Sequence, residues 1–375
     1  METVFWLFLI AAPFSSFLLW FFFGRDRPII ETVEFRPPEG LTPAEVGLLW
    51  DGKVHDRDIS AMFLDWANKG IISIEEFARG DLLIHRKGVL PSKAKPFEEK
   101  LYRGLFIISS SISARVLATE IYNIKNDAKD DLLKMYGSNS IKSLYDLRSL
   151  EMRNLVFVIA LLPFIFHVIY LYTVMGVEVF EGAFAILNMG RMGTPLVVLA
   201  YLMVKITKNF VLLSLSGKPM TLSITGAFFL SPFFAAAIIL FAILGAPLFK
   251  SPLHAAFAML STVLCVFIAV LMPKRTFFYS RVLGKIRGYA NFIRAAELDR
   301  LKMLLKENPG YTYDMLPYVW AMGMLEEWSE LLERYSLVTG PPSWYKANDE
   351  NVAFSYSRMT DSLKKAFGDY EDGAT

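Results

Sequence analysis

The chain has 375 residues, of which 54% are hydrophobic, 14% aromatic and 20% charged. Ordinary soluble domains carry about 45–50% apolar and about 25% charged residues, so this composition argues against a soluble protein and favours a membrane protein. The net charge of +2 says little as a total, and the single cysteine, Cys265, excludes an intrachain disulfide.

Apolar runs long enough to cross a bilayer divide the chain into alternating parts. A hydrocarbon core of about 30 Å needs about 20 apolar residues in a helix. Four uncharged runs meet this length, and a fifth segment is included although Arg191 lies within it. The sequence therefore predicts about five transmembrane helices, at residues 4–23, 155–177, 184–204, 221–246 and 254–272.

The distribution of lysine and arginine predicts the orientation of these spans. Residues 24–153 and the stretch after Pro273 are rich in both, and the positive-inside rule places such segments in the cytoplasm. The chain must then cross the membrane an even number of times between them. Glu2 precedes the first span and Arg25 follows it, which is the reverse of a secretory signal peptide. This span is therefore predicted to be an anchor with its N-terminus outside.

The cytoplasmic segment after the first span begins with two helices and a pair of strands. The sequence TPAE at 42–45 predicts a helix start with a capping box, and Gly52 its end. A second amphipathic helix is expected from a cap at Asp58 to a stop at Gly70, followed by the strands IISIE and LLIHR. This order predicts a winged-helix-like α+β element.

The charge of this element bears on its partner. Winged helices often bind DNA, but the second helix and the hairpin carry as many acidic as basic residues, which leaves little attraction for phosphates. Nucleic acid is therefore an unlikely partner. Winged helices also dock proteins, and we expect that here, with Asp58, Asp65 and Trp66 as candidate interaction residues.

A cluster of basic residues follows the last span directly. Each can gain about 1 kcal/mol from anionic lipid heads, although simple positive-inside anchoring explains them as well. Membrane lipids are thus one expected partner. The members of the cluster are Lys274, Arg275, Arg281, Lys285 and Arg287.

One acidic residue interrupts the apolar stripe of the helix that begins in this cluster. Apolar residues recur at helical spacing over 283–304, and Glu297 lies among them. A carboxylate buried alone would be costly, so it is either paired or functional. We favour a structural ion pair with Arg294 or Arg300, each three residues away, over a functional acid.

A second helix is expected to begin at Pro317, with Trp328 on its apolar face. Together the two helices predict a cytoplasmic helical hairpin over 274–336. Residues 337–375 are expected to form a mostly flexible polar tail, with a short helix near 359–367 as an open alternative.

No catalytic, cofactor or metal motif stands out, so none is predicted and the chain is not expected to be an enzyme.

Two polar residues inside the predicted spans, His167 and Arg191, are functional candidates because polar groups at that depth are costly. They support an alternative interpretation, a small-solute or proton transporter or channel. Snorkelling of Arg191 and hydrogen bonding of His167 near Pro163 would explain them structurally.

Three stretches resemble the YciQ-like family of predicted bacterial membrane proteins, a domain of unknown function. They are RPPEGLTPAEVGLLWDGKVHDRDISAMFLDWANKGIISIEE, GKIRGYANFIRAAELDRLK and MLPYVWAMGMLEEWSELLERY. The resemblance covers both predicted cytoplasmic parts in the expected order. It implies an N-terminal extracytoplasmic domain that this chain is expected to lack, and it brings no established activity.

The sequence thus predicts a mainly α membrane protein of the bacterial inner membrane. Its leading interpretation is a multi-pass scaffold whose cytoplasmic elements dock a protein partner or a second copy of the chain. The expected division is a transmembrane anchor, a cytoplasmic winged-helix-like and helical domain, a four-helix transmembrane region, a cytoplasmic hairpin and a tail, at residues 1–23, 24–153, 154–273, 274–336 and 337–375.

Overall fold

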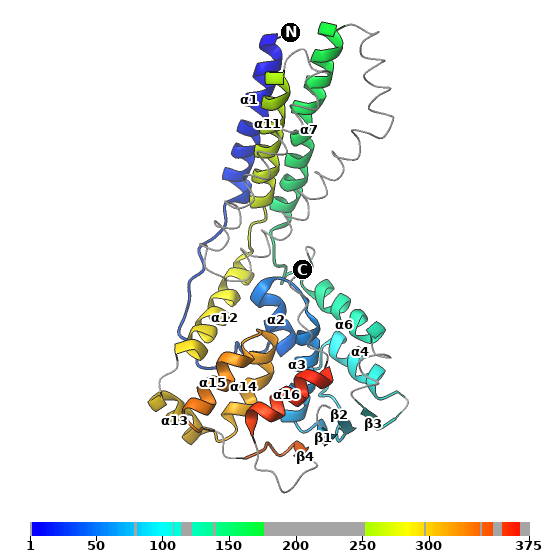
Figure 1. The fold of residues 1–375 in the computed structure, drawn as a ribbon, viewed down its shortest axis with the longest axis vertical. Helices are drawn as coiled ribbons and strands as arrows, with labels where there is room; N and C mark the ends of the chain where they lie inside the picture. The colour runs from blue at the N-terminus through cyan, green and yellow to red at the C-terminus, as the bar shows by residue number, and fades with distance from the viewer. Residues whose placement is uncertain are drawn as a thin grey trace. The chain divides into compact units, whose positions relative to one another are not determined.

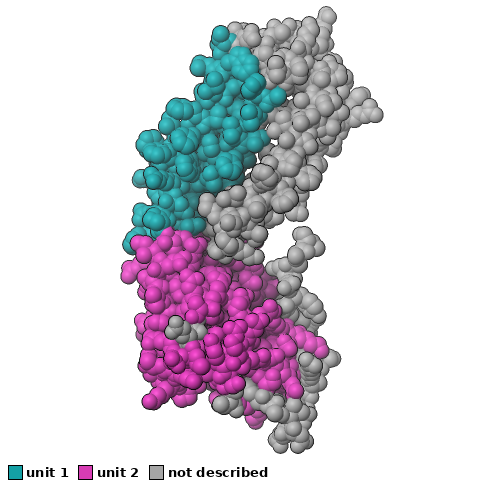
Figure 2. All heavy atoms as spheres, turned by 60° about the vertical axis from the view of Figure 1, so that its left-hand side comes forward, with its two compact units in different colours: residues 1–28, 145–277 teal, residues 29–144, 278–375 magenta. Residues whose placement is uncertain are grey.

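The computed structural model describes residues 2–78, 81–107, 109–113, 122–137, 140–175, 252–295, 298–337, 340–347 and 355–367. The chain divides into two compact units, coloured separately in Figure 2. Unit 1 comprises Met1–Pro28 and Tyr145–Phe277, and unit 2 comprises Ile29–Leu144 and Phe278–Thr375. Both units are therefore built from two separate stretches of the chain.

Unit 1 contains three apolar helices that lie side by side (Figure 1). Helix α1, Glu2–Leu19, continues into a π-helical turn, η1, Trp20–Gly24. Helix α7 spans Leu147–Met175, and helix α11 spans Pro252–Leu271. Each of the three contacts the other two.

The packing of unit 1 places small residues between the helices and large apolar residues outside. Ala12, Ala160 and Cys265 form one buried cluster, and the Ser261 hydroxyl donates to the Leu9 carbonyl at 2.8 Å. Large exposed side chains occur on all three helices: Phe14, Phe22, Val158, Leu161, Phe257 and Phe267. Helices in lipid pack in this way, because small residues let backbones approach closely while lipid solvates the large ones.

The described residues do not support the predicted number of about five spanning helices. Among them, only Thr3–Gly24 is both long and apolar enough to cross a membrane, with a mean hydropathy of 2.0, and Ala256–Leu271 is a shorter apolar helix. Helix α7 covers most of the predicted span 155–177. The predicted spans 184–204 and 221–246 lie outside the described residues.

Unit 2 combines helices with a small mixed sheet. Its first stretch holds α2, α3, β1, β2, α4, β3 and α6, at Pro43–Asp51, Asp56–Asn68, Ile72–Ala78, Asp81–Arg86, Pro96–Leu105, Ser111–Ser113 and Tyr122–Met135. Its second stretch holds α12, α13, α14, α15, β4 and α16, at Phe277–Ala295, Leu298–Glu307, Tyr311–Ala321, Leu325–Arg334, Tyr345–Ala347 and Tyr356–Phe367.

The sheet has the strand order β3-β2-β1-β4. Strands β1 and β2 form the predicted hairpin, with Ile74 opposite Ile84, and β3 pairs antiparallel with β2. Strand β4 pairs in parallel with the outer edge of β1, where Ile74 lies opposite Tyr345. Alternation along β1 buries Ile72 and Ile74 and leaves Glu75 exposed, as expected for a sheet with one covered face.

Helix α3 lies at the centre of unit 2 and is packed by elements of both stretches. Helix α2 contacts it from the first stretch and α14 from the second. Its apolar face, with Phe63 and Trp66, is fully buried. The Arg57 guanidinium at its start donates through Nε to the Ala321 carbonyl at 3.2 Å. The two stretches therefore share one hydrophobic core.

The extended segment that opens unit 2 is fixed along α12. A Cβ added to Gly284 or Gly288 would overlap the carbonyl oxygen of Ile30 or Thr32, respectively. The Tyr311 hydroxyl donates to the Phe35 carbonyl at 2.5 Å, and the Phe35 ring packs edge-on against Phe292 with centroids 5.2 Å apart. We call residues 29–37 the strap.

The C-terminal helices differ from the predicted hairpin. The predicted stripe over 283–304 is buried where described, but it is divided between α12 and α13. Pro317 lies inside α14 instead of starting a helix, and α14 and α15 are separated at Gly323, whose φ is +68°. The predicted flexible tail is folded in two places. Within 340–347 strand β4 joins the sheet, and within 355–367 helix α16 buries Met359 and Leu363.

Candidate functional site

The capping box of α2 places a fully buried carboxylate at the start of that helix. Glu45 is the third residue of α2, and its Oε2 accepts the backbone N–H of Thr42 at 2.7 Å. The Thr42 hydroxyl in turn accepts the N–H of Glu45 at 3.3 Å. The predicted helix start is therefore confirmed in detail, and Glu45 has no exposed surface.

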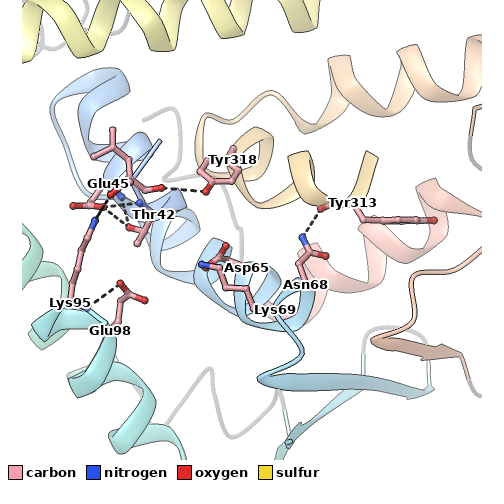
Figure 3. Close-up of polar contacts among 11 residues, drawn as sticks. Thr42, Glu45, Asp65, Asn68, Lys69, Lys95, Glu98, Tyr313 and Tyr318 are labelled. Carbon is pink, nitrogen blue, oxygen red and sulfur yellow. Dashed lines mark hydrogen bonds and ion pairs between the residues drawn. The ribbon is translucent and has the colours of Figure 1, made fainter. Parts of the chain in front are cut away.

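Two groups from later helices meet this carboxylate. The Lys95 ammonium pairs with Glu45 Oε2 and also donates to the Gly40 carbonyl at 3.0 Å (Figure 3). The Tyr136 hydroxyl, from the end of α6, donates to Glu45 Oε1 at 2.8 Å. Burial and the charge of Glu45 raise the pKa of Tyr136, so its hydroxyl stays protonated as a donor. Glu45 thus joins α2 to α4 and α6.

A second acid–base pair lies on α3, beside the first (Figure 3). The Lys69 ammonium contacts Asp65 Oδ2 at 2.5 Å, one helical turn away. Asp65 is buried while the Lys69 side chain is half exposed. Burial raises the pKa of Asp65, and the charges of Lys69 and Lys95 oppose that shift. The two lysines therefore share the neutralisation of this carboxylate.

Glu98 completes the group from α4. Its Oε1 accepts the backbone N–H of Lys95 at 3.2 Å, which caps α4. Burial raises the pKa of Glu98, the capping bond and the two lysines oppose this, and the charge of Asp65 adds to it. We call these five residues the charge cluster: Glu45, Asp65, Lys69, Lys95 and Glu98.

The end of α3 is fixed by an amide that fills a gap in α14. Pro317 has no N–H, so the Tyr313 carbonyl four residues earlier lacks its usual helical donor. Asn68 Nδ2 donates to that carbonyl at 2.6 Å (Figure 3). Asn68 Oδ1 accepts the Trp344 indole N–H, also at 2.6 Å. One side chain therefore links α3 to α14 and to the turn before β4.

The chemistry of the charge cluster is that of a structural ion network. Lysines balance the charge of its carboxylates, and Glu45 and Glu98 also accept backbone N–H groups at helix N-termini, which is how buried charges are accommodated in proteins. Within the described part of the chain, no group of three or more His, Cys, Asp or Glu side chains is placed to hold a metal ion. Contacts of Glu45 link α2 to Lys95 at the start of α4 and to Tyr136 at the end of α6, and Asp65 of α3 is coupled to Lys95 by charge.

The predicted interaction residues of the winged-helix-like element are buried. Asp58 and Trp66 have no exposed surface, and Asp65 is 5% exposed. Asp58 is not the N-cap, because α3 begins earlier, at Asp56, and Asp58 Oδ2 accepts the His55 N–H at 2.7 Å. Trp328 is also fully buried. These side chains support the fold of unit 2 and do not form an exposed face.

The predicted basic cluster is divided by the structure. Arg275 pairs with Asp26 at 3.1 Å inside unit 1. Arg287 lies 3.8 Å from Glu31 of the strap inside unit 2. Arg281 is exposed and Lys285 and Lys274 are half-buried. Only part of this cluster is therefore open to solvent or lipid.

Three candidates fall where the structure gives no side-chain description. Arg191 and Glu297 lie outside the described residues. His167 lies within α7, but its side chain is not described.

Sequence reasoning missed Lys95 and Glu98 of the charge cluster. The pattern Lys-Pro-Phe-Glu at 95–98 does carry a local signal of a helix start, with a proline at the first helical position and a glutamate at the third.

Comparison with known proteins identifies the family alone. No curated protein and no solved structure matches the chain. A family model described as the C-terminal domain of predicted membrane protein DUF2207 matches residues 32–332, which include most of the strap, the charge cluster and most of the helices of both units. The chain therefore belongs to the DUF2207 family of predicted membrane proteins, whose function is unknown.

Proposed function

We propose that the protein is a multi-pass membrane scaffold of the YciQ-like type, whose unit 2 lies in the cytoplasm and docks a protein partner. One observation carries the proposal: unit 2 is folded from the two stretches that flank residues 145–277. A chain that leaves a folded unit and returns to it must cross a membrane an even number of times in between. An even number is compatible with the four crossings predicted for the intervening region, and α1 supplies one more crossing before unit 2.

The architecture of unit 2 supports an interaction role. We propose that α2, α3 and the β1–β2 hairpin form a winged-helix-like element, a design that serves in protein docking as well as in DNA binding. Asp58, Asp65 and Trp66 are buried, so a protein partner must contact other surfaces of unit 2. Large apolar side chains that unit 2 exposes singly are candidates for contact: Ile30, Val33, Val89, Ile107 and Ile141.

Labelling of introduced cysteines tests the topology. With Cys265→Ser as background, Ile141→Cys and Glu330→Cys place one thiol in each stretch of unit 2, and Glu2→Cys places one at the predicted outer end. A membrane-impermeant maleimide applied to intact cells should label only Glu2→Cys. After permeabilisation it should label all three. Labelling of either unit 2 position in intact cells would overturn the cytoplasmic placement.

Photo-crosslinking tests the docking role directly. A photoreactive amino acid at Val33, Val89 or Ile107 should give at least one discrete protein adduct in cells, and the same probe at the exposed Ile10 of α1 should give lipid adducts only. An adduct of twice the mass would identify a second copy as the partner. Absence of any protein adduct at the three unit 2 positions would refute the scaffold.

A further inference from the structure

The basic residues of unit 1 gather at one end of its apolar helices. Among its described residues, every Lys and Arg lies just after η1, in the first two turns of α7, or just after α11. We call these six residues the basic girdle: Arg25, Arg27, Arg148, Arg153, Lys274 and Arg275. Three acidic residues share this end: Asp26, Asp146 and Glu151.

Hydrogen bonds connect the three helix ends at this point. The Asp146 N–H donates to the Lys274 carbonyl at 2.9 Å, and the Lys274 N–H donates to the Ser149 hydroxyl at 3.0 Å. The Arg275 N–H donates to Asp26 Oδ1 at 2.9 Å. The girdle residues therefore share one fixed region.

Two of the three carboxylates are already engaged by protein groups. Asp26 forms an ion pair with Arg275 at 3.1 Å. Asp146 Oδ1 accepts the Ser149 N–H at 3.2 Å and so caps α7. The girdle consequently keeps an excess of positive charge, and Arg25, Arg27 and Arg148 are exposed.

Arg153 has an unusual position within the girdle. It lies about 7.5 Å further along α7 than Arg148, toward the apolar part of the helix. Its neighbours Met152 and Val156 pack with Met272 and Trp20. Arg153 Nε is buried and has no hydrogen-bond partner among the described residues. A lipid headgroup cannot reach this buried atom, so contact with lipid falls to the exposed girdle residues Arg25, Arg27 and Arg148.

We propose that the basic girdle binds the headgroup of an anionic phospholipid, with the exposed guanidinium groups of Arg25, Arg27 and Arg148 donating to its phosphodiester oxygens. Guanidinium groups suit this acceptor because they bind phosphate oxygens through directed, charge-assisted hydrogen bonds. A lipid fits better than a soluble phosphate because exposed apolar side chains border the girdle and can contact acyl chains: Phe22, Phe23, Leu155 and Leu271. The girdle thereby marks the depth of the lipid headgroups at one end of the three apolar helices.

Spin-labelled lipids in reconstituted membranes test this proposal. The full-length protein is placed in phosphatidylcholine vesicles, and the motionally restricted fraction of spin-labelled phosphatidylglycerol is compared with that of spin-labelled phosphatidylcholine. We expect a preference for phosphatidylglycerol in about 100 mM salt that Arg25→Gln/Arg148→Gln lowers roughly fivefold or more.

Matched variants keep the test decisive. Arg103→Gln removes an exposed arginine of α4 in unit 2, so the lipid preference should not change. Arg27→Gln/Lys274→Gln, at two other positions of the girdle, should reduce the preference as well. Equal restriction of the two lipids by the wild type, or an unchanged preference in the girdle variants, would overturn the proposal. Loss of the preference on adding 50 mM inorganic phosphate, at constant ionic strength, would overturn the choice of a lipid over free phosphate.

Discussion

The backbone of Thr32 passes so close to Gly288 that a Cβ on the glycine would overlap the Thr32 carbonyl oxygen. Gly284, one turn earlier on the same face of α12, meets Ile30 in the same way. The spacing of the two glycines therefore opens a path for the strap along the helix. Beyond them, Asn291 Nδ2 donates to Glu31 Oε2 at 2.8 Å and fixes the register of the strap.

Gly288→Ala should destabilise unit 2. The added methyl group meets backbone atoms, which cannot rotate away, so the strap must shift and lose its contacts with α12. We expect a loss of about 1–3 kcal/mol in the free energy of unfolding, measured by denaturant titration of the full-length protein in detergent. Gly340→Ala is the matched control, since a Cβ there has open space. Equal stability of the two variants would contradict the close packing of the strap.

Asn68→Ala should cost about 1–3 kcal/mol, because it leaves the Tyr313 carbonyl and the Trp344 indole N–H without their partner. A change at Pro317 tests the same contact from the other side. Pro317→Ala restores a backbone N–H to α14 that can satisfy the Tyr313 carbonyl. The cost of Asn68→Ala should therefore be smaller in the Pro317→Ala background. A double-mutant cycle measures this coupling, and strict additivity would argue against the proposed link.

Lys95→Met should be more harmful than the paired substitution Glu45→Gln/Lys95→Met. The single change leaves the buried Glu45 carboxylate without its cation, at a cost of about 3 kcal/mol or more. Removing both charges relieves that penalty, while Thr42 and Tyr136 still hydrogen-bond to the side chain at 45. Unfolding of the three proteins at pH 7 tests the order. A double variant less stable than Lys95→Met would contradict the penalty assigned to an unpaired Glu45 carboxylate.

Asp65 should make unit 2 less stable as the pH rises. Its pKa is raised in the folded protein, so the folded state binds more protons than the unfolded one at pH values above about 3.8, the ordinary value. The resulting cost develops as pH rises through the folded pKa. Asp65→Asn removes this dependence, so its stability relative to wild type should increase from pH 4 to pH 7.5.

Asp131 provides a control of opposite sign. Hydrogen bonds from Lys134 and Lys100 lower the pKa of Asp131, so its contribution to stability is present above the ordinary pKa and is lost as pH falls through the lowered value. The stability of Asp131→Asn relative to wild type should therefore decrease with rising pH. Thermal unfolding from about pH 2.5 to pH 7.5 measures both variants, because the Asp131 contribution changes mainly below its ordinary pKa of 3.8. Parallel curves would contradict the opposed environments of the two carboxylates.

Local signals in the sequence were sufficient for the start of unit 2. Thr42 and Glu45 form the predicted capping box, and Gly52 ends α2 with a φ of +81°, because these features depend on residues within a few positions of each other. The β1–β2 hairpin was likewise predictable from alternation around a polar turn.

Contacts between distant residues were not predictable in the same way. No local pattern in the sequence indicates that Lys95 pairs with Glu45, because 50 residues separate them and many other lysines could have been its partner. Pro317 was expected to begin a helix, because the amide of Asn68 that compensates for its missing N–H lies 245 residues from Tyr313. Strand β4 has only three residues, too few to show a pattern, and it forms because β1 offers an edge.

The two-stretch construction of unit 2 has a consequence for biosynthesis. Helix α3 lacks its covering helix α14 until the ribosome has translated everything up to Ala321, including the whole apolar region. During that interval the face of α3 that α14 covers stays exposed, the kind of surface that chaperones protect. A chain whose apolar region fails to insert, and so does not bring α14 back to α3, is left with this face open to proteases.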